Sequence, residues 1–168
     1  LETLNQLKPA FIENGSVTAG NSSPITDGAT ALLVCSLEYA KKNNIEILAK
    51  IRSIAVHGCE PDYMGLGPIG ATNKALKRSS LTMKDIGLVE LNEAFASQSI
   101  ACVRELEIDE DKLNIDGGAI AIGHPLGATG ARITGKAASL LKREGVEFAL
   151  ATQCIGSGQG LSTILQAV

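Results

Sequence analysis

The sequence has few aromatic residues and no concentration of positive charge. Of its 168 residues, 3% are aromatic, tryptophan is absent, and the formal net charge is −3. A nucleic-acid-binding surface needs clustered lysine and arginine for the phosphates and aromatic rings on which bases stack. No apolar run reaches the roughly 20 residues that a membrane-spanning helix needs. The composition therefore argues against a nucleic-acid partner and against a membrane span.

Cysteine and histidine are also scarce. The four cysteines, Cys35, Cys59, Cys102 and Cys154, are scattered without a C-x-x-C pair, and the chain has two histidines. These residues offer no plausible ligand set for a structural zinc ion, so we expect no metal site. Free thiols without a secretory signature favour a reducing compartment.

The sequence does have enough apolar material for one core. Hydrophobic residues make up 45% of the chain, and a chain of this length typically buries about 70% of its unfolded surface, so it needs no disulfide or metal. The chain opens with LETL rather than with methionine. We interpret it as a fragment whose amino-terminal part, with any targeting segment, is missing. We find no repeat or linker and predict one domain over residues 1–168.

Apolar and polar stretches alternate in a way that predicts an α/β fold. Strand-like runs cover residues 29–35, 45–56, 88–91, 148–154 and 161–167. One helix-like stretch ends near residue 42, and three others cover residues 69–78, 92–106 and 127–142. Strands that alternate with helices and end in two adjacent strands indicate a layered domain. We therefore expect a mixed five-stranded sheet with helices on both faces.

His124 lies in the most informative stretch of the chain, residues 117–127 (GGAIAIGHPLG). Glycines let a backbone approach a ligand closely, and Pro125 pre-sets the first turn of the helix that follows. Cys154 ends a hydrophobic run and begins the stretch CIGSGQG. Free backbone N–H groups in such a loop can stabilise a thiolate or an oxyanion. A thiol and an imidazole on two glycine-rich loops suggest acyl chemistry.

Each of these features has a simpler interpretation as well. A cysteine at a strand end is commonly a small buried hydrophobe, and His124 alone could be structural, as we expect for His57. Asn92 and Glu93 open a predicted helix. At such a position an asparagine side chain caps the first turn, and the negative charge of a glutamate interacts favourably with the helix dipole. In the functional alternative, the Asn92 amide holds a water or a ligand carbonyl. Residues 65–70 match G-x-G-x-x-G without directly following a strand, which argues against dinucleotide binding.

Taken together, three motifs resemble those of the thiolase family's carboxy-terminal half. They are NEAFA at residues 92–96, the His124 stretch, and CIGSGQG at residues 154–160, in the family's order and with similar spacing. The segment VTAGNSS at residues 17–23 resembles the family's pantetheine-contacting loop. The resemblance therefore spans nearly all of the chain.

The finer match is to the degradative 3-ketoacyl-CoA thiolases, which residues 59–61 (CEP), Met64-Gly65 and Gln159 resemble more than they do the biosynthetic enzymes. This implies a layered thiolase-like fold and cleavage of a 3-ketoacyl-CoA by CoA, giving acetyl-CoA and a shortened acyl-CoA, in fatty acid β-oxidation. Coenzyme A would be a substrate, with no permanently bound cofactor. A full-length homo-oligomer, or a subunit of a β-oxidation multienzyme complex, is implied. The location would be cytoplasmic in a bacterium, or the mitochondrial matrix or peroxisome in a eukaryote.

The resemblance also implies a role for each catalytic residue. His124 would activate a nucleophilic cysteine and contribute its Nε2 to one oxyanion hole, which a water held by Asn92 would complete. Cys154 would carry the proton to and from the acetyl-CoA carbanion. The N–H of Gly156 would help to form a second hole around the acyl-enzyme oxygen.

Two substrate contacts and one gap follow in the same way. Ser23 would touch the pantetheine arm, and Met64 would line the site. Many family members have a glycine where this chain has Ser157, which bears on the substrate more than on the chemistry. The family's acyl-accepting cysteine lies in the amino-terminal half, and none of the four cysteines here matches its setting. We therefore expect the isolated chain to be inactive without its missing amino-terminal domain.

Three other functions compete with this one. The chain could be a non-catalytic module that binds CoA thioesters, or part of a biosynthetic acetoacetyl-CoA thiolase. A hydrolase with a Cys154–His124 dyad would need no missing half, but the sequence supplies no obvious carboxylate to orient the imidazole.

Overall fold

The computed structural model describes all of residues 1–168. Its strands are β1 (Lys50–Gly58), β2 (Leu88–Leu91), β3 (Phe148–Ile155) and β4 (Gln159–Gln166). Its α-helices are α1 (Glu2–Asn5), α2 (Leu37–Lys42), α3 (Gly67–Ser79), α4 (Ala96–Glu105), α5 (Ala119–Ile122) and α6 (Leu126–Glu144). Short 3-10 helices are η1 (Ala19–Asn21), η2 (Pro61–Leu66), η3 (Met83–Asp85) and η4 (Glu110–Lys112). Most predicted elements form close to their expected positions, and β2 forms at the predicted residues.

The strands form one mixed sheet in the order β1-β4-β3-β2. The pairs β1–β4 and β4–β3 are antiparallel, whereas β3 and β2 are parallel. The carboxyl ends of β2 and β3 therefore meet at one edge of the sheet. Asn92 directly follows β2, and Cys154 is the next-to-last residue of β3. This edge is where two of the predicted catalytic residues come from.

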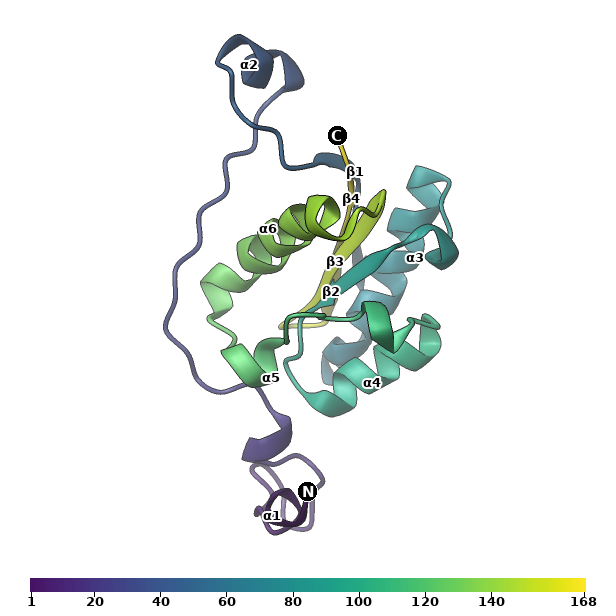
Figure 1. The fold of residues 1–168 in the computed structure, drawn as a ribbon. Helices are drawn as coiled ribbons and strands as arrows, with labels where there is room; N and C mark the ends of the chain where they lie inside the picture. The colour runs from purple at the N-terminus through teal and green to yellow at the C-terminus, as the bar shows by residue number, and fades with distance from the viewer.

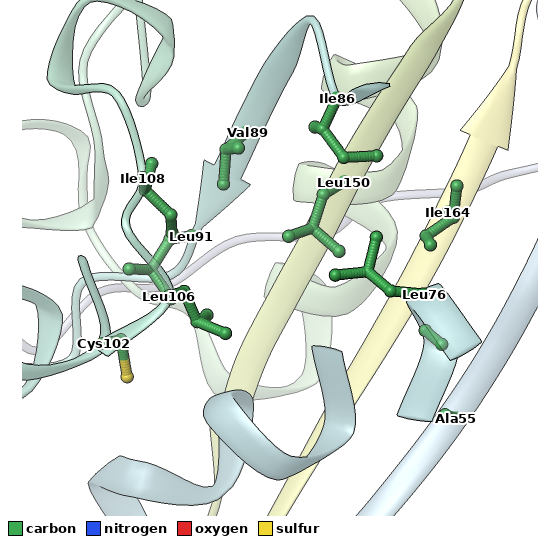
Figure 2. Close-up of a cluster of buried hydrophobic side chains, with 11 residues drawn as sticks. Ala55, Leu76, Ile86, Val89, Leu91, Cys102, Leu106, Ile108, Leu150 and Ile164 are labelled. Atoms are coloured by element: carbon green, nitrogen blue, oxygen red, sulfur yellow. The ribbon is translucent and has the colours of Figure 1, made fainter. Parts of the chain in front are cut away.

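Helices cover both faces of the sheet, as predicted: α6 lies on one side, with α3 and α4 on the other (Figure 1). The side chains of β2 alternate between these layers. Leu88 packs with Ile133 and Leu140 of α6, while Leu91 belongs to the cluster on the α3–α4 side (Figure 2). Leu150 belongs to the same cluster as Leu91 and is fully buried. The two apolar layers fix the sheet edge between two rigid supports.

The predicted strand at residues 29–35 is wrong, and the sheet has four strands rather than five. The segment is extended and exposed, with Leu33 and Val34 at 70% and 69% exposure. It runs beside α6, where a Cβ added to Gly135 would touch Leu32 (Figure 1). Apolar residues form a sheet strand only where a neighbouring strand supplies hydrogen-bond partners. None of the four strands lies beside this segment, so the chain stays extended without joining the sheet.

The predicted helix start at Asn92 is also wrong. Helix α4 begins at Ala96, with Phe95 as its N-cap residue and no side-chain cap. The backbone N–H of Asn92 instead donates to the carbonyl of Thr152 at 2.9 Å, which continues the β2–β3 ladder. The asparagine side chain is therefore not used for helix capping.

The glycines of the G-x-G-x-x-G match serve close packing. A Cβ on Gly67 would overlap the backbone at Gly160 of β4, and a Cβ on Gly70 would overlap the ring of His57. The amino-terminal turn of α3 thus lies directly on the sheet. This contact explains the glycine spacing without a nucleotide.

Candidate functional site

His124 stands in the connection between α5 and α6. Gly123 before it has a φ of 101°, a left-handed conformation that favours glycine. Pro125 after it is the N-cap residue of α6. The backbone N–H of His124 donates to Oγ1 of Thr26 at 3.3 Å, which ties the connection to the extended segment that runs beside α6.

Both ring nitrogens of His124 have a partner. Nδ1 lies 2.7 Å from Oγ1 of Thr129, and Nε2 lies 3.2 Å from Nδ2 of Asn92. The Thr129 hydroxyl donates its own hydrogen to the Pro125 carbonyl at 3.0 Å, so it accepts from Nδ1. The Asn92 Nδ2 group can only donate, so Nε2 accepts. The two contacts select the neutral tautomer with the proton on Nδ1 and a lone pair on Nε2.

The environment keeps this imidazole neutral. Burial lowers the pKa of His124, and the positive charge of Arg132 lowers it further. A neutral ring with its lone pair on Nε2 can act as a base once an approaching group takes the place of the Asn92 Nδ2 contact.

Asn92 has an unused acceptor at the same place. The residue is 1% exposed, and its Oδ1 is buried without a hydrogen-bond partner. A buried carbonyl oxygen without a partner costs free energy unless a water or a ligand donates to it. The side chain is therefore arranged to bind His124 through Nδ2 and a further donor through Oδ1.

Cys154 lies on the same edge of the sheet and leads into the turn that joins β3 to β4. Gly156 in this turn is exposed, and Ser157 and Gly158 have φ of 70° and 89°. Burial raises the pKa of the Cys154 thiol, and the neighbouring Cys59 thiol raises it further. The sulfur is thus a protonated thiol that can give a proton, rather than a stabilised thiolate. Its hydrogen bonds do not include one to His124 or Asn92.

Ser23 joins the site from a distant part of the chain. Its hydroxyl and backbone N–H both donate to the carbonyl of Ala94, at 3.2 and 3.1 Å. An open cavity of about 410 Å³ lies here, lined by Ser23, Pro24, Ile25, Thr26, His124 and Leu126. The structure therefore brings Ser23 and His124 to one hollow, and Asn92 is linked to it through its contact with the His124 ring.

Met64 lies in η2, which packs against β3 and β4. The residue is half-buried. No hydrogen bond or pocket lining connects it to His124 or Ser23. Of the six predicted site residues, it has the weakest structural link to the others.

Sequence reasoning missed the residues that hold the imidazole in place. Thr129 bonds to the ring of His124, and Thr26 bonds to its backbone N–H. Glu93 bonds to the backbone of the segment before His124. Thr129 is five residues after His124, at the start of a helix that follows a proline. This spacing brings a helical side chain back toward the residue before the helix, and that was the available signal.

No group of three or more histidine, cysteine, aspartate or glutamate side chains is gathered closely enough to hold a metal ion. No helix is both long and apolar enough to cross a membrane.

Comparisons with known proteins agree along the whole chain. The family model described as "Thiolase, C-terminal domain" matches residues 45–167, and "Thiolase, N-terminal domain" matches residues 1–38. The 3-ketoacyl-CoA thiolase of Photorhabdus laumondii is 52% identical over 170 residues, covering 99% of this chain and 44% of the relative. That of Yersinia enterocolitica is 53% identical over 172 residues, covering 100% and 44%.

Solved structures give the same result. The human mitochondrial 3-ketoacyl-CoA thiolase in complex with CoA is 47% identical, with a TM-score of 0.96. The Bacillus anthracis acetyl-CoA acetyltransferase is 43% identical, also with a TM-score of 0.96. Each match covers 99% of this chain and 42% of the solved chain. The chain thus spans less than half the length of the proteins that it matches.

Proposed function

The chain belongs to the thiolase family, as its motifs predicted, and we propose that it supplies part of the active site of a degradative 3-ketoacyl-CoA thiolase. In this proposal, the longer protein cleaves a 3-ketoacyl-CoA with CoA to give acetyl-CoA and a shortened acyl-CoA. The observation that carries the proposal is the contact of 3.2 Å between Asn92 and the Nε2 of a neutral His124. A base and an unsatisfied acceptor side by side suit a reaction that needs both a thiolate and an oxyanion hole.

The first step forms an acyl-enzyme. The Nε2 of His124 takes the proton of a cysteine thiol from outside this chain, and the thiolate attacks the 3-keto carbon. The Cα–Cβ bond then breaks, and its electron pair moves into the enolate of acetyl-CoA. The enolate carbon takes the proton from Cys154, whose raised pKa keeps that proton in place until the carbanion forms.

The second step returns the enzyme to its starting state. The Cys154 thiolate takes the proton of an incoming CoA thiol, and the CoA sulfur attacks the acyl-enzyme carbonyl. The nucleophilic cysteine leaves as a thiolate and regains its proton from the His124 imidazolium. Overall, one C–C bond and the S–H bond of CoA are broken, and one C–S bond and one C–H bond are formed. Both enzyme thiols have regained a proton.

Two sets of donors would stabilise the negative oxygens. Nε2 of His124, once protonated, would donate to the first oxygen together with a water. The second hydrogen of that water would be donated to the free Oδ1 of Asn92. The N–H of Gly156 would donate to the second, around the acyl-enzyme oxygen. Each such element is typically worth about 10²- to 10³-fold in rate.

The substrate would approach through the open cavity beside His124, with Ser23 against the pantetheine arm and Met64 lining the site. CoA is a substrate in this scheme and is not held permanently, and the solved human relative in complex with CoA supports its binding. A homo-oligomer of the longer protein, membership of a β-oxidation complex and a cytoplasmic location in a bacterium are parts of the same proposal.

A biosynthetic acetoacetyl-CoA thiolase is the second candidate, because the Bacillus anthracis acetyl-CoA acetyltransferase matches as closely in fold. Chain-length preference separates the two. In this proposal we expect a degradative enzyme to cleave long 3-ketoacyl-CoA substrates, and an acetoacetyl-CoA thiolase to cleave the four-carbon substrate that its name states.

A chimeric enzyme tests the proposal. This chain replaces the matching 172 residues of the Yersinia enterocolitica relative, to which it is 53% identical. We expect the chimera to cleave both acetoacetyl-CoA and a long-chain 3-ketoacyl-CoA, and the chain alone to cleave neither. A folded chimera without thiolysis would contradict the proposal, and turnover by the chain alone would favour a dyad hydrolase.

A further inference from the structure

Glu93 makes a set of contacts that the proposed chemistry does not use. Its Oε1 accepts from Nδ2 of Asn114 at 2.9 Å, and its Oε2 accepts from the backbone N–H of Ile120 at 3.0 Å. Asn114 is itself fixed, since its side chain bonds to both the N–H and the carbonyl of Leu91 at 2.9 Å. The carboxylate therefore connects the end of β2 to the first turn of α5.

Gly118 shows that this carboxylate has a reserved space. A Cβ on Gly118 would overlap the carboxyl group of Glu93. The φ of −106° and ψ of −169° at Gly118 are extended values that any residue adopts, so its backbone conformation does not require glycine. The absence of a side chain at this position has one structural use, which is to admit the Glu93 carboxylate.

The contact reaches His124 through a short and rigid path. Ile120 lies in α5, where the N–H of Ile122 donates to Gly118 and that of Gly123 donates to Ala119, at 3.1 and 2.9 Å. His124 follows Gly123 directly. Asn92, at the other end of the path, is the neighbour of Glu93 in the chain.

We propose that Glu93 is a positioning residue for His124: its carboxylate clamps α5 to the Asn92 segment and so holds the imidazole at bonding distance from the Asn92 amide. The catalytic meaning of this clamp rests on the proposed function. The geometry itself does not, because the imidazole can be observed directly whether or not the longer protein is a thiolase.

Glu93→Gln breaks the clamp with almost no change in shape. The amide oxygen can accept from Ile120 or from Asn114 but not from both, because the NH₂ group must then face another donor. The Ile120 amide should exchange with solvent about 10- to 100-fold faster, which matches the loss of a hydrogen bond to a charged group. The ¹⁵N resonances of the His124 ring should move from the pure Nδ1–H tautomer toward an average of the two tautomers. Glu110→Gln, at an exposed glutamate of η4, is the matched control.

Gly118→Ala provides a second route, because it keeps the charge and displaces the carboxylate by its added methyl group. It should give the same amide exchange and the same ring resonances as Glu93→Gln. In a chain with Glu93→Ala, the further change Gly118→Ala should have little effect, since the space is then empty. His57, the other histidine, serves as the internal reference.

Unchanged His124 resonances in folded Glu93→Gln and Gly118→Ala would overturn the proposal and leave Glu93 with a role in stability alone. Loss of folding in both variants would also contradict it, because the clamp would then be a requirement of the core. A failure of thiolysis in the chimera, with the ring resonances changed as expected, would count against the proposed function and not against the clamp.

Discussion

Thr129→Val removes one oxygen from the site and should change the state of its imidazole. Thr129 is fully buried in the first turn of α6, and its Oγ1 is the only partner of Nδ1 of His124, at 2.7 Å. Valine has the same shape and a similar helix propensity, so the backbone should not move. The variant therefore isolates the hydroxyl group.

The magnitude follows from what loses its partner. The Pro125 carbonyl still accepts from the N–H groups of Ala128 and Thr129, at 2.9 and 3.0 Å, so it stays satisfied. The Nδ1–H of His124 has no other acceptor, but the ring is half-buried and water can reach it. Two hydrogen bonds are lost, but only the Nδ1–H group is left without a protein partner, so we expect the free energy of unfolding to fall by about 1 kcal/mol. The pKa of His124 should fall below its already lowered value, because the imidazolium loses an acceptor more than the neutral ring does.

Two measurements check this prediction. Denaturant unfolding gives the free-energy change, and an NMR titration of the His124 ring protons gives the pKa, with His57 as the reference. Thr134→Val on the same helix is the control, since its hydroxyl makes no side-chain hydrogen bond. A Thr129→Val chain with the wild-type His124 titration would refute the reasoning that Thr129 selects the Nδ1–H tautomer.

Three further predictions concern other parts of the chain. Burial raises the pKa of Glu90 from 4.5 to about 7. Between these two pH values the folded state binds more protons than the unfolded state, so the free energy of unfolding falls as the pH rises. Glu90→Gln should remove up to about 3 kcal/mol of this fall, measured by unfolding curves at pH 4.5 and 7.5. An equal fall in the free energy of unfolding for the variant and the wild type would contradict the prediction. Ser157→Gly should raise the free energy of unfolding by about 0.5–1 kcal/mol, since φ is 70° there; a lower midpoint in urea would be the contrary result. Ile122 and Leu126, 56% and 83% exposed, should bind a hydrophobic dye, and the pair Ile122→Gln and Leu126→Gln should bind less; equal fluorescence would exclude this face.

The apolar residues of the His124 stretch do not all face the same way. Five apolar residues with almost no polar neighbours would suggest one uncovered face. In the structure Ala119 is fully buried and Ile120 half-buried, whereas Ile122 and Leu126 face outward. Periodicity could not separate these residues, because the stretch folds as a single helical turn between two glycines.

Local pattern was sufficient for the central sheet and for the residues with chemistry of their own. Leu88–Leu91 and the β3–β4 hairpin follow from apolar runs bounded by turn residues, and His124 and Cys154 stand out against their glycines. Residues 29–35 have the same apolar character, yet a strand also needs a partner, and no local pattern encodes one. They lie within residues 1–38, which match the amino-terminal family model, rather than within residues 45–167.

The supporting polar contacts could not be predicted because they join residues far apart in the chain. Thr26 reaches the backbone of His124 across 98 positions, and Glu93 reaches Ile120 across 27. The neighbours of Asn92 in the sequence, taken alone, favour a helix cap. Its true surroundings depend on the β2–β3 pairing, which moves the helix start to Ala96.

The most direct test of the account is Cys154→Ser in the chimeric enzyme. Serine keeps the shape but is far too weak an acid to exchange protons with a carbanion near neutral pH. The nucleophilic cysteine should still take an acyl group from a simple acyl-CoA, while cleavage of a 3-ketoacyl-CoA falls by about 10²- to 10⁴-fold. His124→Ala should impair both reactions, because one imidazole serves both. A Cys154→Ser enzyme that cleaves at the wild-type rate, or that cannot be acylated, would contradict the role assigned to Cys154.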